Sequence, residues 1–459
     1  MQRVLVLDKH KNPLMPCTPA RARILLSQHK AAVFKIYPFT LILKNKTQHN
    51  TQPIQVKIDQ GSKNTGIALV AEFKQGKTVI FAANLQHKGH AISEKLASRA
   101  ASRRSRRSRK TRYRKPKWTN AMSKKQLVHI NQRPKGWFPP SVTSRVDNVT
   151  NLVNKLTRLT PISAIAVENV RFDTQLMENK SISGIEYQQG TLFEKEVKEY
   201  LLHLFHYKCA YCNGLSKDPI LEKEHIIPRS KKGSNRIDNL SLACHTCNQA
   251  KNNLLPQEWL MVLKKSTSKI NKERVKRFTH IIKGIKPSLR DAAVMNAIRY
   301  KLVDALRVFN LPIELGSGGL TKFNRTNQQL PKDHWIDAAC IGQSGNNIII
   351  PKNLIPINIK AVGRGSRQMC LMNKFGFPRT KPKKKGHCFN FKTGDLIKAI
   401  VTKGKKEGTY IGRLAVRTSG NFNISTKNGI VQGINYRYCR LLQKNDGYHY
   451  SNHINQLIN

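Results

Sequence analysis

Short apolar runs near the start of the chain surround one helical segment. The run at 4–7 is strand-like, 11–16 has the prolines of a turn, and 19–28 has helical composition. Two further strands are expected at 31–36 and 40–44. This pattern predicts a small α/β unit at the N-terminal end.

The apolar pattern after residue 53 predicts a larger α/β unit. In order, we expect strands at 54–59, 66–73 and 78–86, a helix over 141–159, a strand at 162–170, a helix over 289–309, a strand at 311–315 and a helix near 332–342. This order suits one mixed sheet with helices packed on it, interrupted twice along the chain. Beyond about residue 350, short β-like runs rich in Gly and Tyr favour a small terminal barrel.

The first interruption is an Arg-rich run. Residues 97–117 hold eleven Lys or Arg and no acid, and no Pro or Gly occurs between Ala91 and Lys115. Ser93 is a possible N-cap and Pro116 a possible stop, so a helix is expected. Its basic side chains point all round and leave no face for a core, so a disordered interaction arm is the alternative. The residues expected to contact nucleic acid are Arg99, Arg103, Arg104, Arg106, Arg107, Arg109, Lys110, Arg112 and Arg114.

Charge changes the picture for the whole chain. The 459 residues include 82 Lys or Arg and 26 Asp or Glu, a formal net charge of +56. There is no signal peptide and no apolar run near the length that spans a bilayer, so nucleic acid is the expected partner and a membrane is not. The nine Cys, without a secretion signal, indicate reduced thiols and a cytosolic protein.

Four acid or His positions of the predicted mixed sheet point to hydrolysis. Asp59 and Glu168 end two strands, and His334 and Asp337 lie on one face of a short helix. Strand-end carboxylates meet at one edge of a sheet, where they would hold one or two Mg²⁺ ions for attack of water on a phosphodiester. Asp333 shares the face of Asp337 but fits a helix start better.

The second interruption, from about 174 to 288, contains two C-x-x-C pairs. Their spacing is typical of a closed tetrahedral Zn²⁺ site, whose four thiolates leave no position for a substrate, so its role would be structural. The expected zinc ligands are Cys209, Cys212, Cys244 and Cys247.

Between and after these pairs lies a second candidate hydrolytic centre. His225 would take a proton from water, beside Glu224 and Asn248, which would hold a metal ion, with Asn239 in the same motif. This centre would be separate from the sheet-edge carboxylates.

These motifs together resemble a known family. "EHIIPRS", "IDNLSLACHTCNQAK" and the Cys pairs resemble an HNH nuclease domain, while "IDQGSKNTGIAL", "AVENVRFD" and "DHWIDAA" resemble the three split motifs of a RuvC-type nuclease. With "NPLMP" near the start, the order is similar to the IscB family of transposon-encoded RNA-guided nucleases, relatives of type II CRISPR nucleases. One departure is Gln60, where Pro commonly follows the first RuvC Asp.

The resemblance implies a multidomain α/β fold. It consists of an RNase H-like (RuvC) mixed sheet interrupted by an Arg-rich bridge helix and by a zinc-bearing HNH (ββα-metal) domain, flanked by a small N-terminal α/β unit and a β-rich C-terminal domain. The implied parts are a PLMP-like domain (1–52), RuvC part I (53–92), the bridge helix (93–117), RuvC part II (118–173), the HNH domain with linkers (174–288), RuvC part III (289–350) and a basic C-terminal domain that reads the target-adjacent motif (351–459).

The resemblance also implies partners and roles. HNH, with His225 as general base and Asn239 orienting its loop, would cut the guide-paired strand of double-stranded DNA, and RuvC would cut the displaced strand. Both sites would use Mg²⁺ or Mn²⁺, and zinc would be structural. The expected state is a monomeric ribonucleoprotein with a noncoding guide RNA in the prokaryotic cytoplasm. An unguided homing-type HNH endonuclease and a non-catalytic binder of a structured RNA remain alternatives.

Overall fold

The computed structural model describes residues 2–45, 51–108, 136–169, 197–283, 290–363, 370–374, 377–381 and 387–452. These form two compact units, one of residues 1–171 with 294–459 and one of residues 172–293. No helix in these ranges has the length and apolar character needed to cross a bilayer.

The N-terminal end of the first unit is a four-stranded sheet with one helix. Its elements are β1 (Val4–Leu7), β2 (Pro13–Cys17), α1 (Pro19–Ser27), β3 (Ala31–Lys35) and β4 (Thr40–Leu43), in the strand order β2-β1-β4-β3. The turn predicted at 11–16 is wrong, because Pro13 to Pro16 lie in β2. That strand is at the edge of its sheet, where a proline costs no ladder hydrogen bond.

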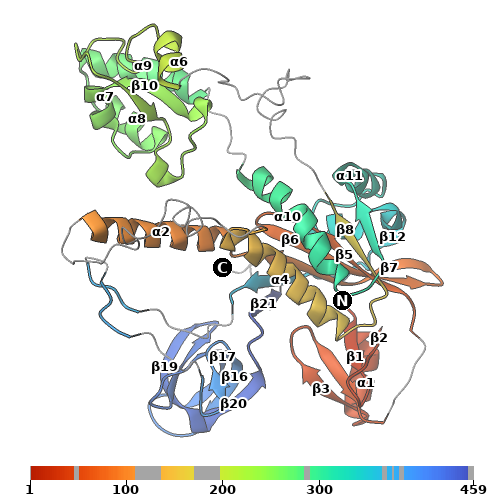
Figure 1. The fold of residues 1–459 in the computed structure, drawn as a ribbon. Coiled ribbons are helices and arrows are strands. Elements are labelled where there is room, and N and C mark those ends of the chain that lie inside the picture. Colours follow the sequence, from red (N-terminus) through yellow and green to blue (C-terminus); the bar gives the residue numbers. More distant parts are fainter. Residues whose placement is uncertain are drawn as a thin grey trace, which may run out of the picture. The chain divides into compact units, whose positions relative to one another are not determined.

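One mixed sheet of eight strands forms the centre of the first unit (Figure 1). Its strands are β5 (Ile54–Asp59), β6 (Asn64–Phe73), β7 (Gly76–Gln86), β8 (Ala164–Glu168), β11 (Ile313–Gly316), β12 (Ile348–Ile349), β13 (Ile357–Ala361) and β21 (Tyr448–Asn452). The order is β11-β8-β5-β6-β7-β13-β21, with β12 also paired to β7. The predicted mixed sheet is therefore present, and β13 and β21 extend it past the expected boundary at residue 350.

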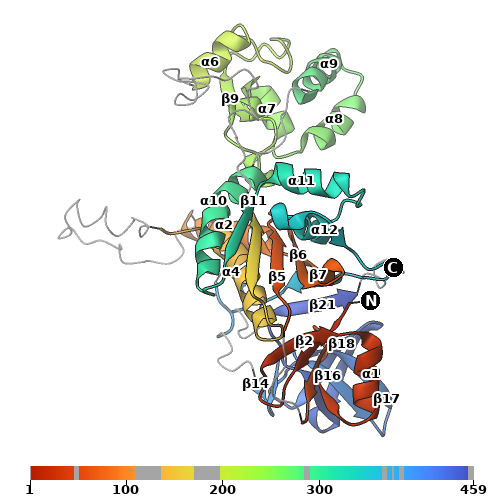
Figure 2. The same ribbon diagram turned by 90° about the vertical axis from the view of Figure 1, so that its right-hand side faces the viewer.

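Helices cover both faces of this sheet (Figure 2). They are α2 (Gly89–Ser108), α4 (Pro140–Thr157), α10 (Arg290–Arg307), α11 (Gly318–Asn327) and α12 (His334–Ala339). The apolar stripe predicted for α4 is buried, including Val142, Val149 and Leu156. On the other face, Trp335 and Ile336 of α12 pack in a cluster with Ala68 of β6.

The Arg-rich helix is present as α2, which starts four residues before the expected cap Ser93. The rest of the run, with Arg109, Lys110, Arg112 and Arg114, lies outside the described residues.

The C-terminal strands form a five-stranded antiparallel sheet, preceded by a two-stranded one. They are β14 (His387–Cys388), β15 (Phe391–Lys392), β16 (Leu396–Val401), β17 (Gly408–Ala415), β18 (Asn421–Thr426), β19 (Gly429–Asn435) and β20 (Cys439–Gln443). The order is β19-β18-β17-β16-β20. Within the described part of the chain no pairing joins β19 to β20, so the expected barrel is an open sheet.

The second unit is small and contains one hairpin. Its elements are α6 (Val197–Leu204), β9 (Leu221–His225), β10 (Leu240–Cys244), α7 (His245–Lys251), α8 (Pro256–Lys264) and α9 (Lys269–Lys283). The rings of Tyr211, Trp259 and Phe278 pack edge to face at its centre, with centroids 4.7 to 5.3 Å apart. These aromatic contacts give a unit of this size a core beyond its hairpin.

Candidate functional site

Parallel pairing brings the first two predicted carboxylates to one edge of the central sheet. Strands β5 and β8 pair in parallel with Ile58 opposite Val167, so Asp59 and Glu168, the next residues, end side by side. The two side chains interact, since a contact with Asp59 is among the causes that raise the pKa of Glu168.

Helix α12 adds the other two residues. Asp333 is its N-cap and its Oδ1 accepts the His334 backbone N–H at 2.7 Å. Gly66 of β6, opposite Asp59, allows this approach, because a Cβ there would overlap the His334 carbonyl. The His334 Nδ1 then lies 3.2 Å from Asp59 Oδ2.

The three carboxylates are crowded with negative charge. Burial, the hydrogen bond with Asp59 and the charges of Asp59 and Asp337 raise the pKa of Glu168 to about 9. Burial and the charge of Asp59 also raise the pKa of Asp337, and the hydrogen bond to Asp59 raises that of His334. The three carboxyl groups therefore repel one another, and a divalent cation would relieve this repulsion.

One cation that the sequence did not single out already lies in this cluster. Arg325 Nε of α11 is 2.7 Å from Asp337 Oδ1, and both side chains are mostly buried. This contact lowers the pKa of Asp337, against the larger effect of burial. Arg325 thus holds one oxygen of the Asp337 carboxylate.

The loop after Asp59 is held from α4. Arg145, 3% exposed, donates from Nε to the Ser62 carbonyl at 2.7 Å and from Nη1 to the Ser141 carbonyl at 2.7 Å. Gly61 N–H donates to Thr65 Oγ1 at 3.2 Å. These bonds fix the backbone that follows the strand end.

The four predicted zinc ligands come together in the second unit. The sulfur atoms of Cys209, Cys212, Cys244 and Cys247 all lie within 4.8 Å of one another, and all four residues are buried. Four buried thiols around one point fit a tetrahedral zinc ion, which would tie the knuckle before β9 to the start of α7. Among the described residues, this is the one group of three or more His, Cys, Asp or Glu side chains whose ligand atoms all lie within 4.8 Å of one another. The ligand atoms of the three sheet-edge carboxylates are therefore farther apart than those of the four cysteines.

His225 ends β9 on the side opposite to Glu224, since neighbouring strand residues point to opposite faces. Its Nε2 lies 2.9 Å from Asn235 Oδ1. In the tautomer whose Nε2 donates to this amide oxygen, Nδ1 is the ring nitrogen that can accept a proton.

Glu224 has two buried partners. Its Oε1 lies 2.6 Å from Lys251 Nζ, and its Oε2 accepts the Tyr211 hydroxyl. Lys251, fully buried, also donates to the His225 carbonyl at 3.0 Å. The Asn248 amide donates to Glu222 Oε2 at 2.5 Å. Metal binding by Glu224 and Asn248 stays a prediction, and it requires Lys251 to leave Glu224.

Asn239 closes the loop between the two strands of the hairpin. Its Oδ1 accepts Ile227 N–H at 2.9 Å, and its Nδ2 donates to the carbonyls of Ile227 at 3.1 Å and Ser234 at 2.8 Å. These are the contacts expected of a residue that orients the loop.

The described arginines of the Arg-rich helix lie outside the core. Arg99, Arg103 and Arg104 are exposed, as expected for a helix with no apolar face. The side chains of Arg106 and Arg107 lie outside the described part.

Sequence reasoning missed Arg325, Lys251 and Tyr211. In a chain with 82 Lys or Arg, no local pattern marks Lys251 and Arg325 as cations that pack beside acids. Tyr211 lies between the two cysteines of the first Cys pair. Its hydroxyl donates to Glu224, and the sequence alone does not predict this contact.

Comparison with known proteins agrees with these motifs. Residues 4–190 match the family described as RRXRR protein, and residues 209–254 match the family described as HNH endonuclease. A search of curated proteins gave no match.

Solved structures that resemble this chain include Cas9 proteins. The Streptococcus thermophilus Cas9 in complex with the GGAA PAM is 14% identical, with 61% of this chain and 32% of that chain covered and a TM-score of 0.30. The Type II-C Cas9 from Actinomyces naeslundii is 13% identical, with 63% and 59% covered and a TM-score of 0.22. This chain thus spans about a third of the first protein's length, and TM-scores this low do not establish a common fold.

Proposed function

We propose, from the premise that this chain is an HNH-type DNA endonuclease with an RRXRR region, that it is an IscB-like RNA-guided endonuclease with two cutting sites. The observation that carries the proposal is the presence of two separate clusters of acid and His side chains on one chain. One lies at the edge of the central sheet and the other in the hairpin unit, with an exposed Arg-rich helix between the first two sheet motifs.

At the sheet edge, Asp59, Glu168 and Asp337 would hold Mg²⁺ or Mn²⁺. Their donor set fits, since carboxylate oxygens suit these hard cations and the charges of Asp59 and Asp337 raise the pKa of Glu168, a repulsion that a cation would relieve. A bound ion would supply Lewis acidity and a more acidic water. His334 would orient Asp59 through its 3.2 Å contact, and Arg325 would orient Asp337.

In the hairpin unit, His225 would take the proton of the attacking water through Nδ1. Asn235 would fix the imidazole ring by accepting a hydrogen bond from Nε2. Asn239 would hold the loop between β9 and β10, which begins directly after His225. Glu224 and Asn248 would hold the metal ion once Lys251 is displaced, and zinc on the four cysteines would keep β10 and α7 in place.

Guide RNA would choose the target by base pairing, while protein contacts would hold phosphates and shape. A formal charge of +56 supports a large polyanionic partner. The hairpin unit would cut the guide-paired strand and the sheet-edge site the displaced strand. The site of action would be a prokaryotic cytoplasm.

One preparation tests the proposal against its alternatives. The chain is purified from cells that carry its native locus, the bound RNA is sequenced, and DNA matched to that RNA is offered as substrate. We expect a discrete RNA and cutting of matched DNA that stops after RNase treatment. Cutting that persists after RNase treatment would favour an unguided HNH endonuclease. Bound RNA without cutting would favour a non-catalytic RNA binder.

A further inference from the structure

A basic groove runs along α4 in the first unit, away from the carboxylate cluster. Its volume is about 840 Å³. We call it the α4 groove and define it by its six basic residues, which come from four parts of the chain: Lys11, Lys35, Lys88, Lys155, Arg158 and Lys392. Two carboxylates, Asp147 and Asp446, also line it, so the groove carries excess positive charge.

The sequence of α4 explains why this face is polar. The apolar stripe of the helix packs on the sheet, and the polar positions that line the groove recur at helical spacing: Ser144, Asp147, Asn148, Asn151, Asn154, Lys155 and Arg158. Apart from the two cations and Asp147, these are neutral side chains that both donate and accept hydrogen bonds. One side of the groove is therefore a ladder of such groups along a rigid helix.

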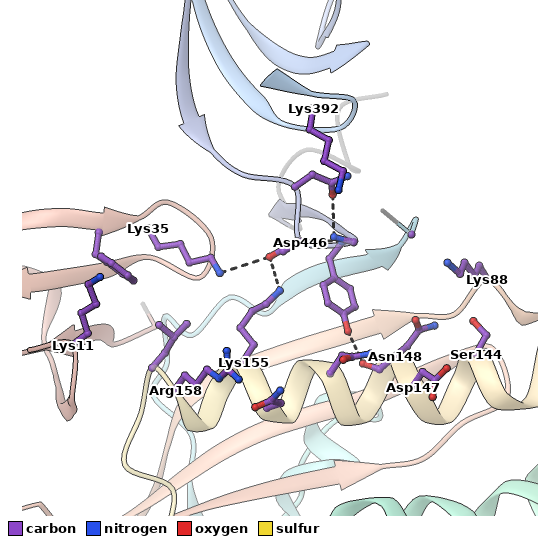
Figure 3. Close-up of a pocket in the computed structure, with 18 of the residues that line it drawn as sticks. Lys11, Lys35, Lys88, Ser144, Asp147, Asn148, Lys155, Arg158, Lys392 and Asp446 are labelled. Atoms are coloured by element: carbon purple, nitrogen blue, oxygen red, sulfur yellow. Dashed lines mark hydrogen bonds and ion pairs between the residues drawn. The ribbon is translucent and has the colours of Figure 1, made fainter. Parts of the chain in front are cut away.

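A buried ion pair sets the centre of the groove (Figure 3). Lys155 Nζ lies 2.5 Å from Asp446 Oδ2 and 2.9 Å from the Tyr450 hydroxyl, which donates to the same carboxylate at 2.7 Å. Lys35 approaches Asp446 at 3.7 Å from the N-terminal strands, and the side chains of Lys155 and Asp446 are 15% and 17% exposed. Asp446 is thus neutralised by the protein and does not repel an anion.

Other cations of the groove are available to contact a ligand. Among the residues that the structure describes, Lys88 and Arg158 make no ion pair, and Figure 3 shows Lys392 across from α4. Cations spaced along a groove, with hydrogen-bonding side chains between them, match the repeating phosphates of a single strand.

The remaining acid distinguishes RNA from DNA. Asp147 is exposed on the rim of the groove and can only accept hydrogen bonds. The backbone of DNA has no donor to offer it, whereas each ribose of RNA carries a 2′-hydroxyl. A carboxylate on a phosphate-binding rim is therefore unfavourable for DNA and useful for RNA.

We propose that the α4 groove binds the backbone of a single-stranded RNA segment, with its basic side chains on phosphates and the Ser and Asn side chains of α4 on riboses and base edges. This deepens the proposed function, from which it takes RNA as the partner, and it assigns that RNA a place on the protein.

The test uses the full chain and lysine acylation read by mass spectrometry. A single-stranded oligouridine RNA is compared with the matching oligothymidine DNA. We expect RNA to protect Lys11, Lys88 and Lys392 more than the exposed turn residues Lys74 and Lys403, and to protect them more than DNA does. Equal protection of groove and turn lysines, or equal protection by the two oligonucleotides, would overturn the proposal.

Charge-neutral variants give a second readout. Lys88→Gln and Arg158→Gln should each lower the slope of log affinity against log salt for the RNA by about 0.7, the value for one phosphate contact of a single strand. Lys74→Gln is the matched control and should leave the slope unchanged. An effect of Lys74→Gln as large as that of the groove variants would contradict the assignment.

Different experimental results would contradict the groove proposal and the nuclease proposal. Protection of the groove by RNA without any cutting of matched DNA would remove the nuclease proposal and support the groove. RNA-dependent cutting without protection of the groove lysines would support the nuclease proposal and contradict the groove proposal.

Discussion

At the scale of single residues, the sheet-edge cluster is a set of acids held in place by two basic side chains. His334 contacts Asp59 and Arg325 contacts Asp337, so each aspartate has one oriented oxygen, and the charges of both aspartates raise the pKa of Glu168. Such strongly perturbed carboxyls in one cluster are typical of functional sites.

Arg325→Gln tests whether this orientation matters. Without the guanidinium, Asp337 loses the partner that fixes one oxygen, and we expect cutting of the displaced strand to slow by about 10- to 100-fold, as for other residues that orient metal ligands. Cutting of the guide-paired strand should not change. Arg307→Gln, which removes an exposed pair with Asp304, is the control. Equal slowing of both strands would contradict the role of Arg325.

His87 predicts a pH dependence of stability. Burial, and then the charge of Arg145, lower its pKa from 6.5 to about 3, so the folded chain keeps it neutral. The unfolded chain binds this proton below pH 6.5, so stability falls with pH from 6.5 down to about 3, by about 1.4 kcal/mol per unit. The loss between pH 6.5 and 5 is about 2 kcal/mol.

Denaturant unfolding at pH 7 and pH 5 checks this effect. His87→Gln should lose about 2 kcal/mol less than the parent between these values, since Gln does not titrate. His10→Gln, at an exposed position, should behave as the parent does. The same loss in parent and His87→Gln chains would show that His87 is not responsible.

Strand-end acids could be predicted from the sequence, because carboxylates that end different strands converge at one edge of a sheet. Asp59 and Glu168 do meet, and His334 does contact Asp59. Arg325 and Lys251 could not be predicted, because their burial depends on packing between segments far apart in the chain.

At the scale of elements, the start of the Arg-rich helix is linked to the sheet-edge site. Helix α2 begins at Gly89, and a Cβ there would overlap the guanidinium of Arg145, which bonds to the Ser62 carbonyl in the loop after Asp59. The glycine lets α2 leave β7 without displacing this arginine.

Gly89→Ala should therefore destabilise the first unit by about 1–3 kcal/mol, the usual cost of overpacking. Thermal unfolding measures the change. Gly319→Ala in α11, where an added Cβ meets no atom within 4 Å, should leave stability unchanged or raise it by up to about 1 kcal/mol. Equal effects of the two substitutions would contradict the close approach of Arg145.

Zinc should hold the second unit together. Removing it with a chelator leaves four buried thiols as the link between the knuckle and the hairpin, and structural zinc in small domains contributes about 10 kcal/mol or more. We expect one zinc ion per chain by elemental analysis, and rapid hydrogen exchange of β9, β10 and α7 after chelation. Slow exchange of β5 and β6 is the internal control, and unchanged exchange of the hairpin would contradict a structural zinc.

The hydrophobic periodicity predicted the helices and strands better than it predicted which strands pair with each other. The stripe of α4 was read correctly, whereas β2 was mistaken for a turn because its prolines lie at a sheet edge. The return of β13 and β21 to the central sheet was not foreseen, since a strand pattern does not say which strand it pairs with.

At the scale of the whole molecule, the sheet-edge site is assembled from distant segments. Its acids and His come from β5, β8 and α12, and residues 172–293 form the second unit between the last two of these elements in the chain. A protein with two such sites can cut the two strands of a duplex independently, and this is the central claim.

Strand-resolved cleavage of guide-matched duplex DNA tests that claim most directly. With a different label on each strand, Asp59→Ala should cut only the guide-paired strand and His225→Ala only the displaced strand, while Asp304→Ala, at an exposed position, should cut both. Each active-site variant would then turn a double-strand break into a nick. If either variant still cut both strands at the parent rate, the assignment of two independent sites would be wrong.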